Sequence, residues 1–173
     1  TRASGGRFQT VAQRLGSDVP FFLARQAAVC RGRGEIVLPV DSFPQLPLVV
    51  VYPATHLATP EVFQELAAPD FNGTTNHGFS KRLAEHLADL RAGAWSRLAD
   101  WMSNDLLPAA KRLSDAVARV LAAIKSLDVV GATMTGSGSA CVALCRSTKH
   151  ARHVAGVLSS RKLGNVWATS TCH

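Results

Sequence analysis

The sequence predicts an α+β fold in which helices cover a mainly antiparallel sheet, in a ferredoxin-like arrangement. Three observations support this fold class. A continuous apolar run at residues 48–52 has the length of a strand, and helical patterning fills most of residues 59–124. Residues 129–171 then follow the order strand, Gly-rich turn, strand, helix and strand. We expect residues 47–173 to form this α+β domain and residues 1–46 to be the tail of a different one.

The first 46 residues predict a helix followed by a hairpin. Apolar residues at positions 8, 11, 12 and 15 have helical spacing, and the pattern ends near Gly16. Residues 27–31 and 35–40 are typical of strands, and a Gly-Arg-Gly turn joins them.

Beyond residue 46, the run at 48–52 predicts a strand buried on both faces. Thr59-Pro60-Glu61 predicts a helix start, because proline and an acidic residue both favour the first turn. A Gly- and Asn-rich loop at 70–78 precedes two helical segments, 79–90 and 95–102. A long amphipathic helix is then predicted from one apolar stripe: Leu106, Ala110, Leu113, Val117, Leu121 and Ile124. Its other side carries a solvated basic face: Lys111, Arg112, Arg119 and Lys125.

The last third predicts strands at 129–134, 140–145 and 166–171, with a helix at 148–160. The apolar face of this helix is Ala151, Val154, Ala155 and Leu158. Cys141 and Cys145 alternate with other residues in ACVALC, so on a strand they share one face, where cysteine acts as a small apolar residue.

The composition argues against membrane-spanning and nucleic-acid-binding classes of protein. The 173 residues are 47% hydrophobic and carry a net charge of +7. No apolar run approaches the ~18 residues that span a bilayer, and we expect neither a membrane span nor a signal peptide. Basic residues are scattered and aromatics do not interleave with them, so the charge favours a solvated surface or a small phosphorylated ligand over nucleic acid.

The cysteines and histidines predict neither a metal site nor a disulfide framework. No CxxC motif occurs, and His150 and His153 form a pair without a third ligand nearby in sequence. A reducing cytoplasm is the expected compartment.

Three short motifs could carry chemistry. In LGSDVPFF, Asp18 lies between a helix-ending glycine and an apolar segment, where it could act as a general base or simply cap or bridge a turn. The segment 134–140, MTGSGSA, could form a phosphate-binding nest or a tight hairpin turn. In TPEVF, Phe63 could stack on a base or belong to the core.

Taken together, these motifs resemble the C-terminal part of the GHMP kinase superfamily, and within it the family of 4-diphosphocytidyl-2-C-methyl-D-erythritol kinases. LGSDVPFFL resembles the segment around the family's catalytic aspartate, and GRGEIVLPV resembles the hairpin after it. The family's cytidine-contacting segment is resembled by LPLVVVYPATHLATPEVF. Its short Asn-Asp motif before a long helix is resembled by Asn104-Asp105-Leu106, and its third, Gly-rich motif by GATMTGSGSACVAL.

The resemblance implies an ATP- and Mg²⁺-dependent kinase that phosphorylates the 2-hydroxyl of the methylerythritol moiety. Asp18 would be the catalytic base. Phe63 would stack on cytosine, with Thr59 and Pro60 shaping that pocket. The phosphate side would be lined by the Gly-rich loop: Thr135, Gly136, Ser137, Gly138 and Ser139.

The sequence also departs from the family. The long Gly/Ser-rich loop that cradles ATP by a helix N-terminus does not occur in these residues, which begin with threonine rather than methionine. We therefore expect the natural start to lie upstream or to have been removed, the 173 residues alone not to turn over substrate, and a truncated domain edge to promote self-association. Two alternatives stay open: another GHMP kinase acting on homoserine, mevalonate or a sugar, and a non-catalytic binding module that contacts RNA.

Overall fold

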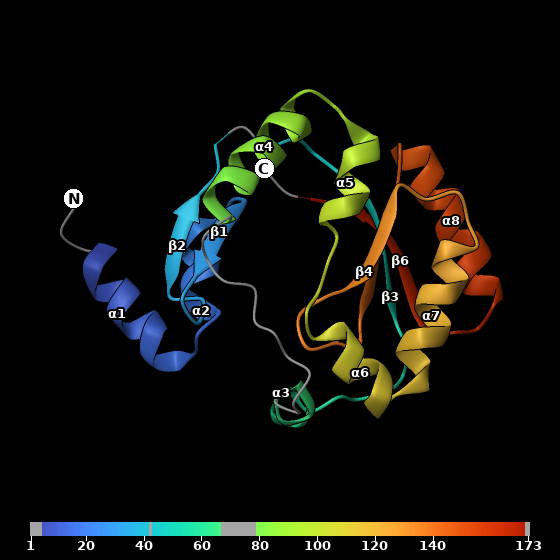
Figure 1. Cartoon of the computed structure of the whole chain (residues 1–173), viewed down its shortest axis with the longest axis horizontal. Helices are drawn as coiled ribbons and strands as arrows, with labels where there is room; N and C mark the ends of the chain where they lie inside the picture. Colours follow the sequence, from blue (N-terminus) through green and yellow to red (C-terminus); the bar gives the residue numbers. More distant parts are fainter. Residues whose placement is uncertain (1–4, 42, 67–78, 172–173) are drawn as a thin grey trace. The chain divides into compact units, whose positions relative to one another are not determined.

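The computed structural model describes residues 5–41, 43–66 and 79–171, which fold into two compact units (Figure 1). The first unit extends to Gln45 and the second comprises Leu46–Thr171. The Gly- and Asn-rich loop predicted at 70–78 lies outside the described residues.

Two short helices and a hairpin make up the first unit. The predicted helix and hairpin are both confirmed, and the hairpin register runs from Ala28 opposite Pro39 to Arg31 opposite Ile36. A second helix was not predicted. It has Pro20 in its first turn, where the fixed φ of proline suits a helix start. The elements in order are α1 (Gly5–Leu15), α2 (Val19–Ala24), β1 (Ala28–Arg31) and β2 (Ile36–Pro39).

The second unit contains a four-stranded sheet in the order β4-β5-β3-β6, with every neighbouring pair antiparallel. This order and the β-α-β-β-α-β succession confirm the predicted α+β, ferredoxin-like class, with several helices in the first crossover. Its strands are β3 (Pro47–Tyr52), β4 (Gly131–Met134), β5 (Cys141–Leu144) and β6 (Asn165–Ser170). Its helices are α3 (Thr59–Leu66), α4 (Phe79–Arg91), α5 (Trp95–Trp101), α6 (Leu107–Leu113), α7 (Asp115–Lys125) and α8 (Thr148–Ser160).

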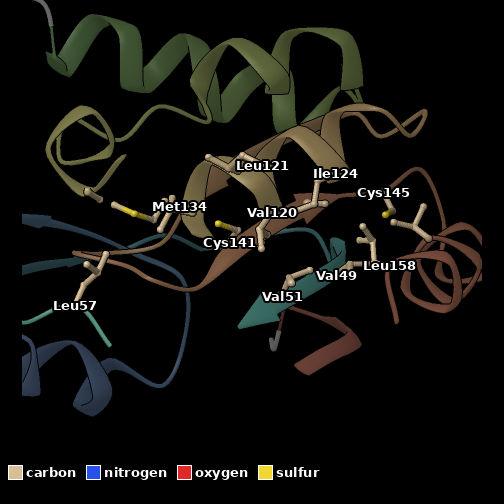
Figure 2. Packing of buried hydrophobic residues seen from close by; sticks show 14 of the residues in the cluster. Val49, Val51, Leu57, Val120, Leu121, Ile124, Met134, Cys141, Cys145 and Leu158 are labelled. Carbon is tan, nitrogen blue, oxygen red and sulfur yellow. The ribbon is translucent and has the colours of Figure 1, made fainter. Parts of the chain in front are cut away.

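The main core lies between one face of this sheet and two helices. α7 packs against β4 and β5, and α8 packs against β3 and β6. Figure 2 shows Val120 and Ile124 of α7 lying over Val49 and Val51 of β3, and all four side chains are almost fully buried.

β3 is not buried on both faces as predicted. Leu48 and Val50 are half-buried and Tyr52 is 39% exposed, because α7 and α8 cover only the face that carries the alternate residues. α5 packs against β4 at the opposite face, where a Cβ atom on Gly131 would lie 2.8 Å from Sδ of Met102.

The single long helix predicted over 106–124 is wrong. Ser114 adopts an extended conformation (φ −153°) that separates α6 from α7, and its Oγ accepts a hydrogen bond from the N–H of Ala116 at 3.2 Å. This serine is therefore an N-cap, and the break turns Leu113 out of the stripe to 41% exposure. The predicted basic face is exposed as expected.

None of the helices in the described ranges is long and apolar enough to cross a bilayer. In the same ranges, no three His, Cys, Asp or Glu side chains form a cluster that could hold a metal ion. Cys30, Cys141 and Cys145 are free thiols, and the last two are buried.

Candidate active site

The Gly-rich loop at 135–140 connects the antiparallel strands β4 and β5. The loop is closed by hydrogen bonds from the N–H of Thr135 to the carbonyl of Ala140 and from the N–H of Gly138 to the carbonyl of Thr135, both 2.9 Å. Gly136 (φ 52°) and Gly138 (φ 91°) are in the left-handed region that favours glycine. The loop is thus a tight hairpin turn. Apart from Gly136 and its two chain neighbours, no residue has a heavy atom within 4 Å of where a Cβ on Gly136 would be, so this part of the loop is open to a ligand.

Asn104 fixes the position of this loop from the start of α6. Its Nδ2 donates to the carbonyls of Met134 (2.7 Å) and Gly136 (2.9 Å), while its Oδ1 accepts from the N–H of Leu106 (2.9 Å). Sequence reasoning noticed the Asn-Asp pair only through the family resemblance and gave Asn104 no role. The available signal was an amide side chain, with two donors and one acceptor group, at a break between helical patterns.

Ser139 fixes the other end of the loop. Its side chain is only 2% exposed, and its hydroxyl donates to the carbonyls of Thr55 and, at 3.4 Å, Pro53. The segment after β3 is thereby tied to the Gly-rich loop. The hydroxyl of Ser139 serves the loop's own structure, whereas Gly136 presents open backbone.

Cys141 begins β5 immediately after the loop and stays a protonated thiol. Burial raises the pKa of Cys141 to about 12, and the positive charge of Lys111 opposes this only weakly. The thiol donates a weak hydrogen bond to the carbonyl of Ser139, with a sulfur–oxygen distance of 3.6 Å. It is therefore not a nucleophile at neutral pH.

α3 is joined to the loop through its first residue. The hydroxyls of Thr59 and Ser137 are hydrogen-bonded at 2.8 Å. Glu65 at the other end of α3 forms an ion pair with Nε of Arg112, and its carbonyl accepts from Nη2 of the same residue at 3.0 Å. α3 is thus held both to the Gly-rich loop and to α6.

Phe63 points outward from α3. Its side chain is 53% exposed, whereas its neighbour Val62 is fully buried and supplies the core contact of this helix. The interpretation of Phe63 as a core residue is therefore wrong. Pro60 is also exposed, so α3 presents an aromatic ring and a proline ring one turn apart.

Asp18 belongs to the first unit, where it immediately precedes α2. Its side chain is exposed and makes no capping hydrogen bond to α2, so the capping interpretation is not supported. Its backbone carbonyl accepts from the N–H of Phe21 at 3.2 Å. The hairpin turn lies close by, because a Cβ on Gly34 (φ 115°) would be 2.7 Å from the carbonyl of Ser17 and 3.3 Å from Oδ1 of Asp18.

Comparison with known proteins agrees with these features. Residues 87–163 match the family described as GHMP kinases C terminal. A 4-diphosphocytidyl-2-C-methyl-D-erythritol kinase from a Nocardioides species is 37% identical over 149 residues, covering 86% of this chain and 49% of that protein. The enzyme of the same name from Thermus thermophilus is 34% identical over 158 residues, covering 91% and 53%.

A solved structure is also similar. The crystal structure of a 4-(cytidine 5'-diphospho)-2C-methyl-D-erythritol kinase matches with a TM-score of 0.73 and 31% sequence identity, covering 94% of this chain and 56% of that one.

The chain therefore belongs to the GHMP kinase superfamily, and its second unit contains the superfamily's C-terminal domain. Within the superfamily, its resemblance is to the 4-diphosphocytidyl-2-C-methyl-D-erythritol kinases. The chain spans about half the length of the curated relatives it matches.

Proposed function

We propose that this chain is part of a kinase that transfers the γ-phosphoryl group of ATP to the 2-hydroxyl of 4-diphosphocytidyl-2-C-methyl-D-erythritol, in non-mevalonate isoprenoid precursor synthesis in the cytoplasm. Relatives of that name match it at 34% and 37% identity. Because the chain spans about half of each, the proposal places the ATP-cradling loop outside these 173 residues and treats the chain alone as inactive. Residues 47–173 would be the C-terminal domain and residues 1–46 the remnant of the N-terminal one.

Exposed apolar side chains support this assignment of the first 46 residues. α1 and α2 leave five large side chains more than half exposed: Phe8, Val11, Leu15, Phe22 and Leu23. So many large apolar side chains on two short helices are typical of a surface that another part of a protein covers.

The hydrogen bond between Thr59 and Ser137 is the observation that carries the proposal. It joins the helix bearing the exposed ring of Phe63 to the Gly-rich loop, so an aromatic surface and open loop backbone belong to one connected piece. A cytidine diphosphate has matching parts, since its base can stack on an aromatic ring and its phosphates can bind backbone N–H groups of a glycine-rich turn.

In this proposal each part has one task. Asp18 accepts or orients the proton of the substrate hydroxyl, and Phe63 stacks on cytosine while Thr59 and Pro60 shape that pocket. Gly136, together with its neighbours at 135–139, lines the phosphate side. Phosphoryl transfer depends mainly on positioning and charge neutralisation, so one carboxylate with such loops is sufficient. Mg²⁺ would arrive on the ATP phosphates, as is usual for this ion.

The test compares Phe63→Ala with Trp167→Ala in the polypeptide that the natural gene encodes. Trp167 is a matched control because it is an exposed aromatic of the same unit, 51% exposed against 53% for Phe63. Loss of base stacking costs about 1–3 kcal/mol, so Phe63→Ala should weaken inhibition by CDP about tenfold. Trp167→Ala should leave it unchanged. Equal CDP and GDP inhibition of the unmodified protein, or an unaltered Phe63→Ala variant, would contradict the cytidine assignment.

A further inference from the structure

A cavity of about 380 Å³ lies within the second unit and includes no residue of the Gly-rich loop or of α3. Three segments form it: the residues after β3, the first turns of α7, and the turn between α8 and β6. Its lining includes Pro53, Thr55, Arg119, Val120, Lys162 and Leu163.

The charge of this cavity is entirely positive. Arg119 and Lys162 are the charged lining residues, and no acidic side chain lines it. Within the part of the chain that the structure describes, neither residue forms an ion pair. Two uncompensated cations at one hollow favour an anionic ligand. The planar fork of arginine and the ammonium of lysine both suit a phosphate group.

The backbone on the Lys162 side of the cavity is conformationally constrained. Lys162 itself has a left-handed backbone (φ 52°), a conformation that glycine or asparagine usually adopts after a helix. Two residues further on, Gly164 packs so closely on the end of β3 that a Cβ atom at this position would clash with the carbonyl oxygen of Tyr52. The ammonium group is therefore carried by a constrained turn rather than by a free loop.

The remaining lining mixes polar and apolar groups. Leu163 is half-buried and adds apolar surface, whereas Val120 and Pro53 are buried and expose little. A volume of this size exceeds the needs of a bare phosphate ion and falls in the range of small-molecule sites, about 300–1,000 Å³. The combination of two cations, the apolar surface of Leu163 and a volume larger than that of phosphate fits a phosphate monoester that carries a small organic group.

We propose that this cavity is a second ligand site, distinct from the candidate active site, that binds a small organic phosphate through Arg119 and Lys162. The cavity wall is connected to the Gly-rich loop, because the carbonyls of Pro53 and Thr55 accept the hydroxyl hydrogen bonds of Ser139. This site does not depend on which alcohol the kinase phosphorylates.

Phenyl phosphate, titrated into the ¹⁵N-labelled 173-residue chain at about 0.15 M salt, is the probe that tests the proposal. Saturable amide shifts are expected at Arg119, Lys162 and Gly164, with smaller ones at Gly138 and Ser139. Inorganic phosphate, which lacks the apolar group, should bind the same residues more weakly. Absence of saturable shifts at the lining residues would overturn the proposal, and equal affinity for the two ligands would overturn its apolar component.

Charge-matched variants separate a specific site from general attraction to a basic protein. Arg119→Ala with Lys162→Ala should weaken phenyl phosphate binding about tenfold or more. Lys149→Ala with Arg152→Ala removes the same charge from the exposed surface of α8 and should leave the affinity unchanged. Arg119→Lys keeps a cation and should retain most of the binding. An equal loss of phenyl phosphate affinity in both double variants would contradict the proposed site. The ¹⁵N spectra of the ligand-free variants serve as the control that each one is folded.

Discussion

Replacing Asn104 tests whether its side chain holds the Gly-rich loop in place. Asn104→Ala removes two hydrogen bonds donated to the carbonyls of Met134 and Gly136 and one accepted from Leu106. Each such bond contributes about 1 kcal/mol net. Because the side chain is half-buried, water replaces part of the loss, and we expect the free energy of unfolding to fall by about 2 kcal/mol.

Asn104→Asp should be more damaging than Asn104→Ala, although it changes the side-chain shape very little. The acceptor for Leu106 remains, but a carboxylate oxygen now faces two carbonyl oxygens at the distances of 2.7 and 2.9 Å that Nδ2 occupied. Protonation relieves this repulsion, so the pKa of the new carboxyl should rise above its usual value near 4. The stability deficit relative to Asn104→Ala should therefore shrink as the pH falls through that raised pKa.

Urea unfolding followed by circular dichroism measures these differences, and the amide signals of Gly136 and Gly138 report on the loop itself. Asn165→Ala is the control, because Asn165 is exposed and its removal should change stability by less than about 0.5 kcal/mol. An Asn104→Ala variant as stable as Asn165→Ala, with unchanged glycine signals, would refute the role given to Asn104.

Three further predictions concern the second unit. Gly164→Ala places a Cβ in a steric clash with the carbonyl oxygen of Tyr52 at φ 138°, so thermal unfolding should show a loss of stability of roughly 2 kcal/mol or more. Ser114→Ala removes the cap on the N–H of Ala116 and should lower the free energy of urea unfolding by about 1 kcal/mol. Burial raises the pKa of Cys141 from 9.0 to about 12, so as the pH rises the thiol loses its proton in the unfolded chain before it does so in the folded one. The free energy of unfolding should therefore fall by about 1 kcal/mol per pH unit above pH 9. In Cys141→Ala the free energy of unfolding should depend less steeply on pH over this range.

Periodicity predicted most of the second unit because its core is built from regular apolar spacing. Ala151, Val154 and Leu158 of α8 are buried as the pattern predicted. The strand at 48–52 was placed correctly, but a uniformly apolar run carries no period, so its half-buried face could not be distinguished from its buried one.

The predicted helix boundaries were wrong where a single polar side chain, rather than the apolar spacing, determines where a helix begins. The stripe through residues 106–124 continues across Ser114, yet the serine hydroxyl caps a new helix there. The second helix of the first unit was missed because VPFFLA is too short to show a helical period.

The candidate site was predictable only in part. The Gly-rich loop and α3 were found from composition, whereas their connections were not. The hydrogen bonds of Asn104 to residues 134 and 136, and of Thr59 to Ser137, join positions 30 or more residues apart. Similarly, nothing in the sequence showed that Val62 rather than Phe63 packs into the core, because both are apolar and adjacent.

The most direct test of the proposed kinase is phosphoryl transfer by the polypeptide that the natural gene encodes, measured as ADP release and by mass spectrometry of the product. The proposal predicts turnover of 4-diphosphocytidyl-2-C-methyl-D-erythritol in preference to homoserine or mevalonate. Turnover should be lost in Asp18→Asn and retained in Asp100→Asn, which changes an exposed carboxylate on α5. Preferred turnover of another alcohol, or an Asp18→Asn variant as active as Asp100→Asn, would contradict it.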